Sequence, residues 1–139
     1  MKFRSFFATL FVVAIGLGLS VQSFAQTNTY ERLSLLEDLT SATCPPCDPA
    51  SEKLNEVVQP ENGIVSVRFH MNWPAPNDPW NLDNPAENDS RRNYYSVTGI
   101  PNAQLNGSYI SPTNGSAILA AVEAANAQMA PVGFEITHT

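Results

Sequence analysis

The chain has 139 residues, of which only two are cysteine, and its formal net charge is −6 at neutral pH. This acidic balance argues against nucleic acid as a partner, because the phosphate contacts that dominate such binding need positive charge. Two cysteines are also too few for a small secreted scaffold held together by disulfides. The fold must therefore depend on a hydrophobic core.

The first 25 residues have the pattern of a secretory signal peptide. Lys2 and Arg4 precede an apolar run from Phe6 to about Leu19, and small residues follow at the cleavage positions 23–25. This run is shorter than the roughly 18 to 20 residues of a membrane span, so we expect no span after signal cleavage. The mature domain would then comprise residues 26–139, carry a charge of about −8 and reside in the periplasm or outside the cell, with outer-membrane association left open.

The first half of the mature chain predicts a strand, a helix and a second strand. Residues 32–40 form an apolar-rich run of strand length that ends just before the cysteines. From 47 to 58 the apolar residues Ala50, Leu54 and Val57 recur at helical spacing, and the segment 59–63 ends the helix. Residues 64–69 are alternating and β-branched, which indicates another strand.

The second half begins with a stretch rich in Pro, Asn and Asp, residues 72–84, which contains Trp73 and Trp80. This composition predicts an irregular excursion, and the sequence does not decide whether the tryptophans cover a functional face or pin the excursion to the core. A proline in the first turn then predicts a helix through about Tyr95. Residues 102–110 predict a hairpin that turns near Asn106-Gly107, and a last amphipathic helix covers 116–129.

This order of elements predicts an α/β fold with a central mixed sheet and helices on both faces. Residues 131–139 could begin a further strand or a further domain, and their role is left open.

The cysteines lie in the sequence Cys44-Pro45-Pro46-Cys47, which allows a redox pair, a structural disulfide or part of a metal site. At a helix start their spacing makes a disulfide easy to form. As a structural link the bridge is weak, because closing a four-residue loop contributes about 2 kcal/mol. If Cys44 caps the helix, the prolines remove two donors, the N–H of Cys47 stays free to face the sulfur of Cys44, and the helix dipole favours a thiolate at Cys44.

A metal site needs more ligands than the pair supplies. His70 and His138 do not have ligand spacing to the cysteines, and a closed zinc site requires four ligands. A single histidine is more often hydrogen-bonded structure, so we expect no metal. The acids at 78, 83, 87 and 89 lack the regular spacing of a calcium loop, and we expect a solvated acidic loop.

The sequence resembles the thioredoxin superfamily in three features. Asp38 stands six residues before Cys44, the CPPC pair opens a helix, and Gly99-Ile100-Pro101 precedes a strand. The resemblance implies that Asp38 lies under the pair and assists proton transfer, that Pro101 is a cis-proline beside the sulfur of Cys44, and that Ile100 pairs with substrate backbone. Neighbouring strand residues point to opposite faces, so Glu37 is the alternative to Asp38.

The string RRNYYSVTGIPNAQLNG, residues 91–107, is more narrowly similar to a bacterial outer-membrane-protein-related branch of thioredoxin-like proteins. The chain departs from the family at Thr43, where a tryptophan is usual, and in the excursion at 72–84. From the resemblance we expect a thiol-disulfide oxidoreductase in which Cys44 attacks the substrate and Cys47 resolves the mixed disulfide. It would act on protein thiols or disulfides, need no cofactor and depend on an unidentified redox partner. The alternative is a non-catalytic binding module whose disulfide is structural.

Overall fold

A four-stranded mixed sheet forms the centre of this computed structural model, which describes residues 30–133 and 137. Its strands are β1 (Ser34–Thr40), β2 (Ile64–His70), β3 (Asn102–Leu105) and β4 (Ser108–Ile110), and their order across the sheet is β2-β1-β3-β4. β1 runs parallel to β2 and antiparallel to β3, which pairs with β4 as a hairpin. The apolar run before the cysteines is thus a central strand.

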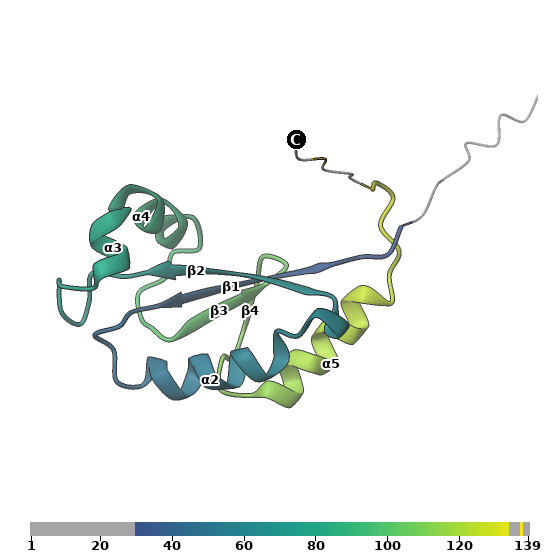
Figure 1. The fold of residues 1–139 in the computed structure, drawn as a ribbon, viewed down its shortest axis with the longest axis horizontal. Coiled ribbons are helices and arrows are strands. Elements are labelled where there is room, and N and C mark those ends of the chain that lie inside the picture. The colour runs from purple at the N-terminus through teal and green to yellow at the C-terminus, as the bar shows by residue number, and fades with distance from the viewer. Residues whose placement is uncertain (1–29, 134–136, 138–139) are drawn as a thin grey trace, which may run out of the picture.

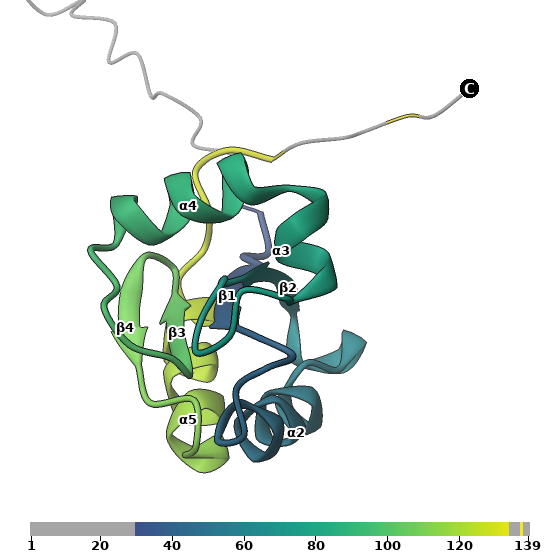
Figure 2. The same ribbon diagram turned by 90° about the vertical axis from the view of Figure 1, so that its left-hand side faces the viewer.

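Helices cover both faces of the sheet (Figure 2). On one face lie α2 (Cys47–Val57) and α5 (Gly115–Asn126), and on the other lie α3 (Pro79–Asp83) and α4 (Pro85–Tyr94), as Figure 1 also shows. A 3-10 turn, η1 (Pro60–Asn62), joins α2 to β2. The predicted α/β architecture, with helices on both faces of a mixed sheet, is confirmed.

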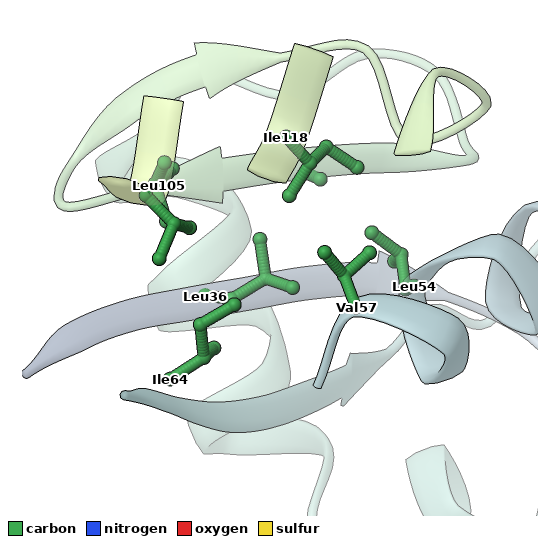
Figure 3. Packing of buried hydrophobic residues seen from close by; sticks show 8 residues of the cluster. Leu36, Leu54, Val57, Ile64, Leu105 and Ile118 are labelled. Atoms are coloured by element: carbon green, nitrogen blue, oxygen red, sulfur yellow. The ribbon is translucent and has the colours of Figure 1, made fainter. Parts of the chain in front are cut away.

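The main hydrophobic core lies between the sheet and the helices α2 and α5 (Figure 3). Alternate residues of a strand point to the same face, and the apolar helical positions of α2 and α5 meet them. The buried members of this cluster are Leu36, Leu54, Val57, Ile64, Ala103, Leu105, Ile118 and Val122. A smaller buried cluster, Leu39, Met71 and Val97, occupies the opposite face of the sheet.

The hairpin turns at Asn106 and Gly107, as the sequence predicts. Both residues have positive φ, 51° and 84°, which is the backbone conformation that an Asn-Gly turn between two strands adopts. The Asn106 side chain also accepts a hydrogen bond from the backbone N–H of Leu35 at 2.9 Å. The turn therefore attaches the hairpin to the start of β1 as well as closing it.

The excursion at 72–84 is more ordered than the sequence predicts, because it contains the short helix α3. Asp78 caps this helix: its side chain accepts hydrogen bonds from the backbone N–H groups of Trp80 and Asn81, and Pro79 occupies the first turn. A proline and asparagine composition had indicated irregular chain. The sequence Asp78-Pro79 is a local signal for a helix start, but the helix that follows has only five residues.

Two sequence predictions fall on the ends of the chain. The signal peptide at 1–25 and most of the segment 131–139 lie outside the described residues. At the border of the latter, Ala130 forms an isolated antiparallel bridge with Tyr30, and the described residues 131–133 are not a strand. No helix within residues 30–133 is long and apolar enough to cross a membrane.

Candidate active site

Cys44 and Cys47 are joined by a disulfide at the start of α2, with their Cα atoms 5.3 Å apart. Cys44 precedes the helix and Cys47 is its first residue. The two prolines between them form a turn in which the N–H of Cys47 donates to the carbonyl of Cys44 at 3.0 Å. This corrects the expectation that Cys44 caps the helix and leaves the N–H of Cys47 free. The helix therefore begins at Cys47, and Pro46 is the residue that precedes it.

Both cysteines are largely shielded from solvent. Cys44 is 6% exposed and Cys47 is 2% exposed. Their order of exposure is the one expected for an attacking and a resolving cysteine, but the difference is small.

Asp38 lies on the face of the sheet that α2 covers. It stands two residues after Leu36, which packs against α2, and it interacts with the Ser51 side chain of that helix. Asp38 is 1% exposed. Arg68 Nε lies 3.3 Å from Asp38 Oδ2, but it is not aligned for a hydrogen bond, so this buried oxygen has no hydrogen-bond partner among the described residues.

The surroundings of Asp38 favour its neutral form. Burial raises the pKa of the Asp38 carboxyl above its usual range, although the charges of Arg68 and His70 oppose this effect. A carboxyl group with a raised pKa can hold and release a proton nearer to neutral pH, which is what a proton-transfer group beside a thiol requires. The catalytic role of Asp38 itself stays a prediction.

Glu37, the alternative acid, is buried on the opposite face. Its carboxylate accepts hydrogen bonds from the Arg91 guanidinium and the Tyr95 hydroxyl of the α4 region. Burial alone would raise the pKa of Glu37, but these two partners hold it below the usual range. In turn, burial and the bond to Glu37 raise the pKa of Tyr95 to about 12. This group is a structural link between β1 and α4, on the far side of the sheet from α2.

Ile100 and Pro101 lie in the loop that leads into β3, and the peptide bond between them is cis. The sheet register pairs Leu39 with Asn102, so Pro101 enters the sheet beside the end of β1, where the chain continues toward Cys44. The close contact of Pro101 with Cys44 and the pairing of Ile100 with substrate stay predictions.

The structure places a histidine and an aspartate beside the loop that precedes Cys44, a grouping that the sequence did not predict. Asp78 Oδ2 lies 2.8 Å from His70 Nδ1 and 2.6 Å from the backbone nitrogen of Ala42. Burial alone would raise the pKa of Asp78, but the hydrogen bonds from His70, Asn81 and Ala42 hold it at about 2. The prediction of a solvated acidic loop is therefore wrong for Asp78, which is fully buried. His70 is hydrogen-bonded structure, as expected.

The excursion at 72–84 also holds the loop before the cysteines at Thr43. Thr43 Oγ1 donates to the carbonyl of Ala75 at 3.2 Å, and the Ala75 N–H donates back to Thr43 Oγ1 at 3.3 Å. The loop before the cysteines and the excursion at 72–84 thus contact each other. The sequence contains no signal that these two segments lie in contact.

A cleft of about 1230 Å³ extends from the disulfide along β2, with α2 on one side and the α3–α4 segment on the other. Trp80 lines it, is 60% exposed and lies 4.8 Å from the His70 ring, measured between centroids. Trp73 instead packs against the small buried cluster around Leu39. The sequence left the positions of the two tryptophans undecided. In the structure Trp80 lines the cleft and Trp73 packs against the core.

Within residues 30–133, no group of three or more His, Cys, Asp or Glu side chains could hold a metal ion. His138, the second histidine of the sequence, is outside the described residues.

No family model matches this chain, and no curated protein matches it in sequence. Among solved structures, protein AGR_C_4864 from Agrobacterium tumefaciens is similar with a TM-score of 0.53 and 24% identity, over 70% of this chain and 46% of that one. The chain thus spans less than half of that protein. Tryparedoxin II from C. fasciculata is similar with a TM-score of 0.47 and 13% identity, over 66% of this chain and 72% of the tryparedoxin.

The fold is thioredoxin-like. The mixed sheet, the helices on both faces and the cysteine pair at the start of the first helix after the central strand agree with this assignment. The likeness to solved structures concerns the fold alone, and the activity is inferred from the site.

Proposed function

We propose that this protein is an exported thiol-disulfide oxidoreductase that acts on protein disulfides or dithiols through Cys44 and Cys47. The observation that carries the proposal is the position of the disulfide, which lies at the start of a helix, at the end of a cleft, with a buried carboxyl group on the same face of the sheet. A bridge that closes four residues contributes only about 2 kcal/mol, so stability alone is a weak reason for it.

In the reducing direction, the Cys44 thiolate attacks one sulfur of a substrate disulfide. A bond forms between Cys44 and that sulfur, the substrate disulfide breaks, and the departing thiolate takes a proton. Cys47 then loses its proton and attacks Cys44, which forms the Cys44–Cys47 bond and releases the second substrate thiol. Two electrons pass from the protein to the substrate, and a separate redox partner must restore the dithiol. The reverse steps oxidise a substrate dithiol.

Asp38 is the residue on this face that we assign to proton transfer from Cys47. A carboxyl group with a raised pKa can accept the thiol proton and return it near neutral pH. Pro101 and Ile100 are assigned to substrate contact, Pro101 beside Cys44 and Ile100 through its backbone. No cofactor is required, because all electrons pass between sulfur atoms.

Export, and the narrower resemblance of residues 91–107 to outer-membrane-related proteins, are parts of the same proposal. This string contains Arg91 and Tyr95, which hold Glu37, and the cis bond before Pro101. Fractionation of cells into periplasm, outer membrane and medium tests where the mature protein resides.

The burial of both cysteines favours a second candidate, a binding module with a structural disulfide, because burial in apolar surroundings makes thiols less reactive. Assays of insulin reduction and of dithiol-peptide oxidation distinguish the two candidates, because only an oxidoreductase should be active in them. The measured reduction potential of the pair would then set the direction of the reaction.

Trapping provides the sharper test. Cys47→Ser leaves the attacking thiol and removes the resolving one, so adducts with exported proteins should accumulate and dithiothreitol should release them. The matched control, Cys44→Ser, should give neither turnover nor adducts. Equal trapping by the two variants would contradict the assigned roles, and no adducts from either folded variant would favour the structural disulfide.

A further inference from the structure

The outer edge of β2 presents free backbone groups. β2 is an end strand of the sheet, and successive residues of a strand direct their N–H and C=O groups to alternate sides. The N–H of Met71 donates to Thr40, and the carbonyl of Gly63 accepts from Ser34, so the odd-numbered residues of β2 face β1. The even-numbered residues, from Ile64 to His70, therefore face outward.

At one end of this edge, side-chain amides occupy the position of a neighbouring strand. The N–H of His70 donates to Asn88 Oδ1 at 3.0 Å, and Asn81 Nδ2 donates to the carbonyl of His70 at 2.7 Å. Both asparagines are buried. Within residues 30–133, no comparable backbone bond reaches Ser66 or Arg68, so this part of the edge is open.

β2 also lacks most of the features by which edge strands avoid pairing. It has no proline and is a regular strand of seven residues paired with β1 along its whole length. Val65 is 50% exposed and Val67 is 41% exposed. Such an edge is a template for one further strand.

The open edge adjoins the cleft that ends at the disulfide, and the charges of that cleft are mostly negative. Its acidic side chains are Asp48, Glu52 and Glu87, whereas its arginine, Arg68, is already in contact with Asp38. Trp80 lies on the wall formed by the α3–α4 segment, and its exposed ring can stack with an arginine guanidinium. The cleft therefore complements an extended segment that carries Lys or Arg side chains.

We propose that a basic, extended segment of the protein substrate adds to the outer edge of β2, beside Ser66 and Arg68, and so brings its disulfide to Cys44. This inference rests on the proposed function for its substrate, but the binding step is separable from the chemistry. Main-chain pairing supplies affinity, and the acidic wall with Trp80 selects the basic side chains.

The test is the binding of a cysteine-free peptide of alternating Lys and Thr to the oxidised protein, measured by calorimetry. We expect Ser66→Pro to weaken binding at least fivefold, because it removes an outward N–H that β1 does not use. Ser66→Ala, which keeps that N–H, should bind like the wild type, and a peptide with Glu in place of Lys should bind at least fivefold more weakly. Equal affinity of folded Ser66→Pro and wild type would overturn the inference.

If Ser66→Pro does not fold, Val67→Lys provides the same test, because a lysine on the exposed strand repels the basic peptide and blocks edge pairing. Unchanged affinity in that variant would also overturn the inference. Self-association that Ser66→Pro abolishes, without peptide binding, would assign the edge to a second copy instead. Reaction with neutral bis(2-hydroxyethyl) disulfide tests the proposed function separately, and Ser66→Pro should leave that rate within twofold.

Discussion

The backbone N–H of Ala42 donates a hydrogen bond to the carboxylate of Asp78, 36 residues further along the chain, over 2.6 Å. The same carboxylate contacts His70 at the end of β2 and caps α3. One buried group therefore joins three segments: the loop before Cys44, the end of β2 and the excursion. The excursion at 72–84 therefore helps to hold the loop that precedes Cys44 in place.

Replacing Asp78 by Asn should destabilise the oxidised protein by about 2 to 3 kcal/mol. The amide has the same shape, but it loses the charge that His70 and three backbone N–H groups stabilise, and hydrogen bonds to a buried charge contribute about that much. Urea unfolding measures the change. Asp83→Asn, an exposed acid on the same helix, should change the unfolding free energy by less than about 0.5 kcal/mol. Equal effects of the two substitutions would contradict the account.

The advantage of the wild type over Asp78→Asn should depend on pH. The pKa of Asp78 is lowered to about 2 in the folded protein, so its carboxylate stabilises the fold fully above the usual pKa of about 4. That stabilisation is lost as pH falls toward 2, because protonation then removes the charge. Unfolding midpoints of both proteins between pH 7 and 2 should therefore converge in acid, and a constant difference across that range would refute the prediction.

Replacing Asp38 by Asn should raise stability at pH 7 while it slows thiol exchange. Burial raises the pKa of this carboxyl, so its ionisation costs folding free energy above the folded-state pKa, and the cost vanishes in acid below about pH 4. If Asp38 transfers the proton of Cys47, insulin reduction should slow at least about tenfold. Denaturant unfolding and initial rates measure the two effects.

Glu37→Gln is the matched control for Asp38→Asn, because the two acids are neighbours in the chain and face opposite sides of the sheet. It should lower stability by about 2 kcal/mol through its weakened bonds to Arg91 and Tyr95. Turnover should stay within about twofold. A loss of activity in this variant as large as in Asp38→Asn would indicate that neither carboxyl has a specific chemical role.

One of the four tyrosines should ionise later than the others on titration with alkali. Burial and the bond to Glu37 raise the pKa of Tyr95 to about 12. Absorbance of tyrosinate against pH should show a late step that Tyr95→Phe removes, and this variant should lose about 1 to 2 kcal/mol of stability. Tyr94→Phe, at a side chain 71% exposed, should keep the late step. Loss of that step in Tyr94→Phe would contradict the assignment.

Local pattern in the sequence was sufficient to predict most elements, because alternation and helical spacing act over neighbouring residues. The β-branched run became β2, the periodic run after the cysteines became α2, and Asn106-Gly107 formed the hairpin turn. The position of the cysteine pair at a helix start was also readable. What local pattern missed was small, such as α3 and the turn that delays the start of α2.

The tertiary structure decided which groups meet. The sequence left Glu37 and Asp38 as alternatives, and only the packing of α2 on one face and α4 on the other separated them. The bond of Asp78 to Ala42, and the cleft that includes Trp80, join residues more than 30 positions apart. Such contacts depend on how whole elements pack against one another. A single sequence carries no local signal that tells which distant residues this packing brings together.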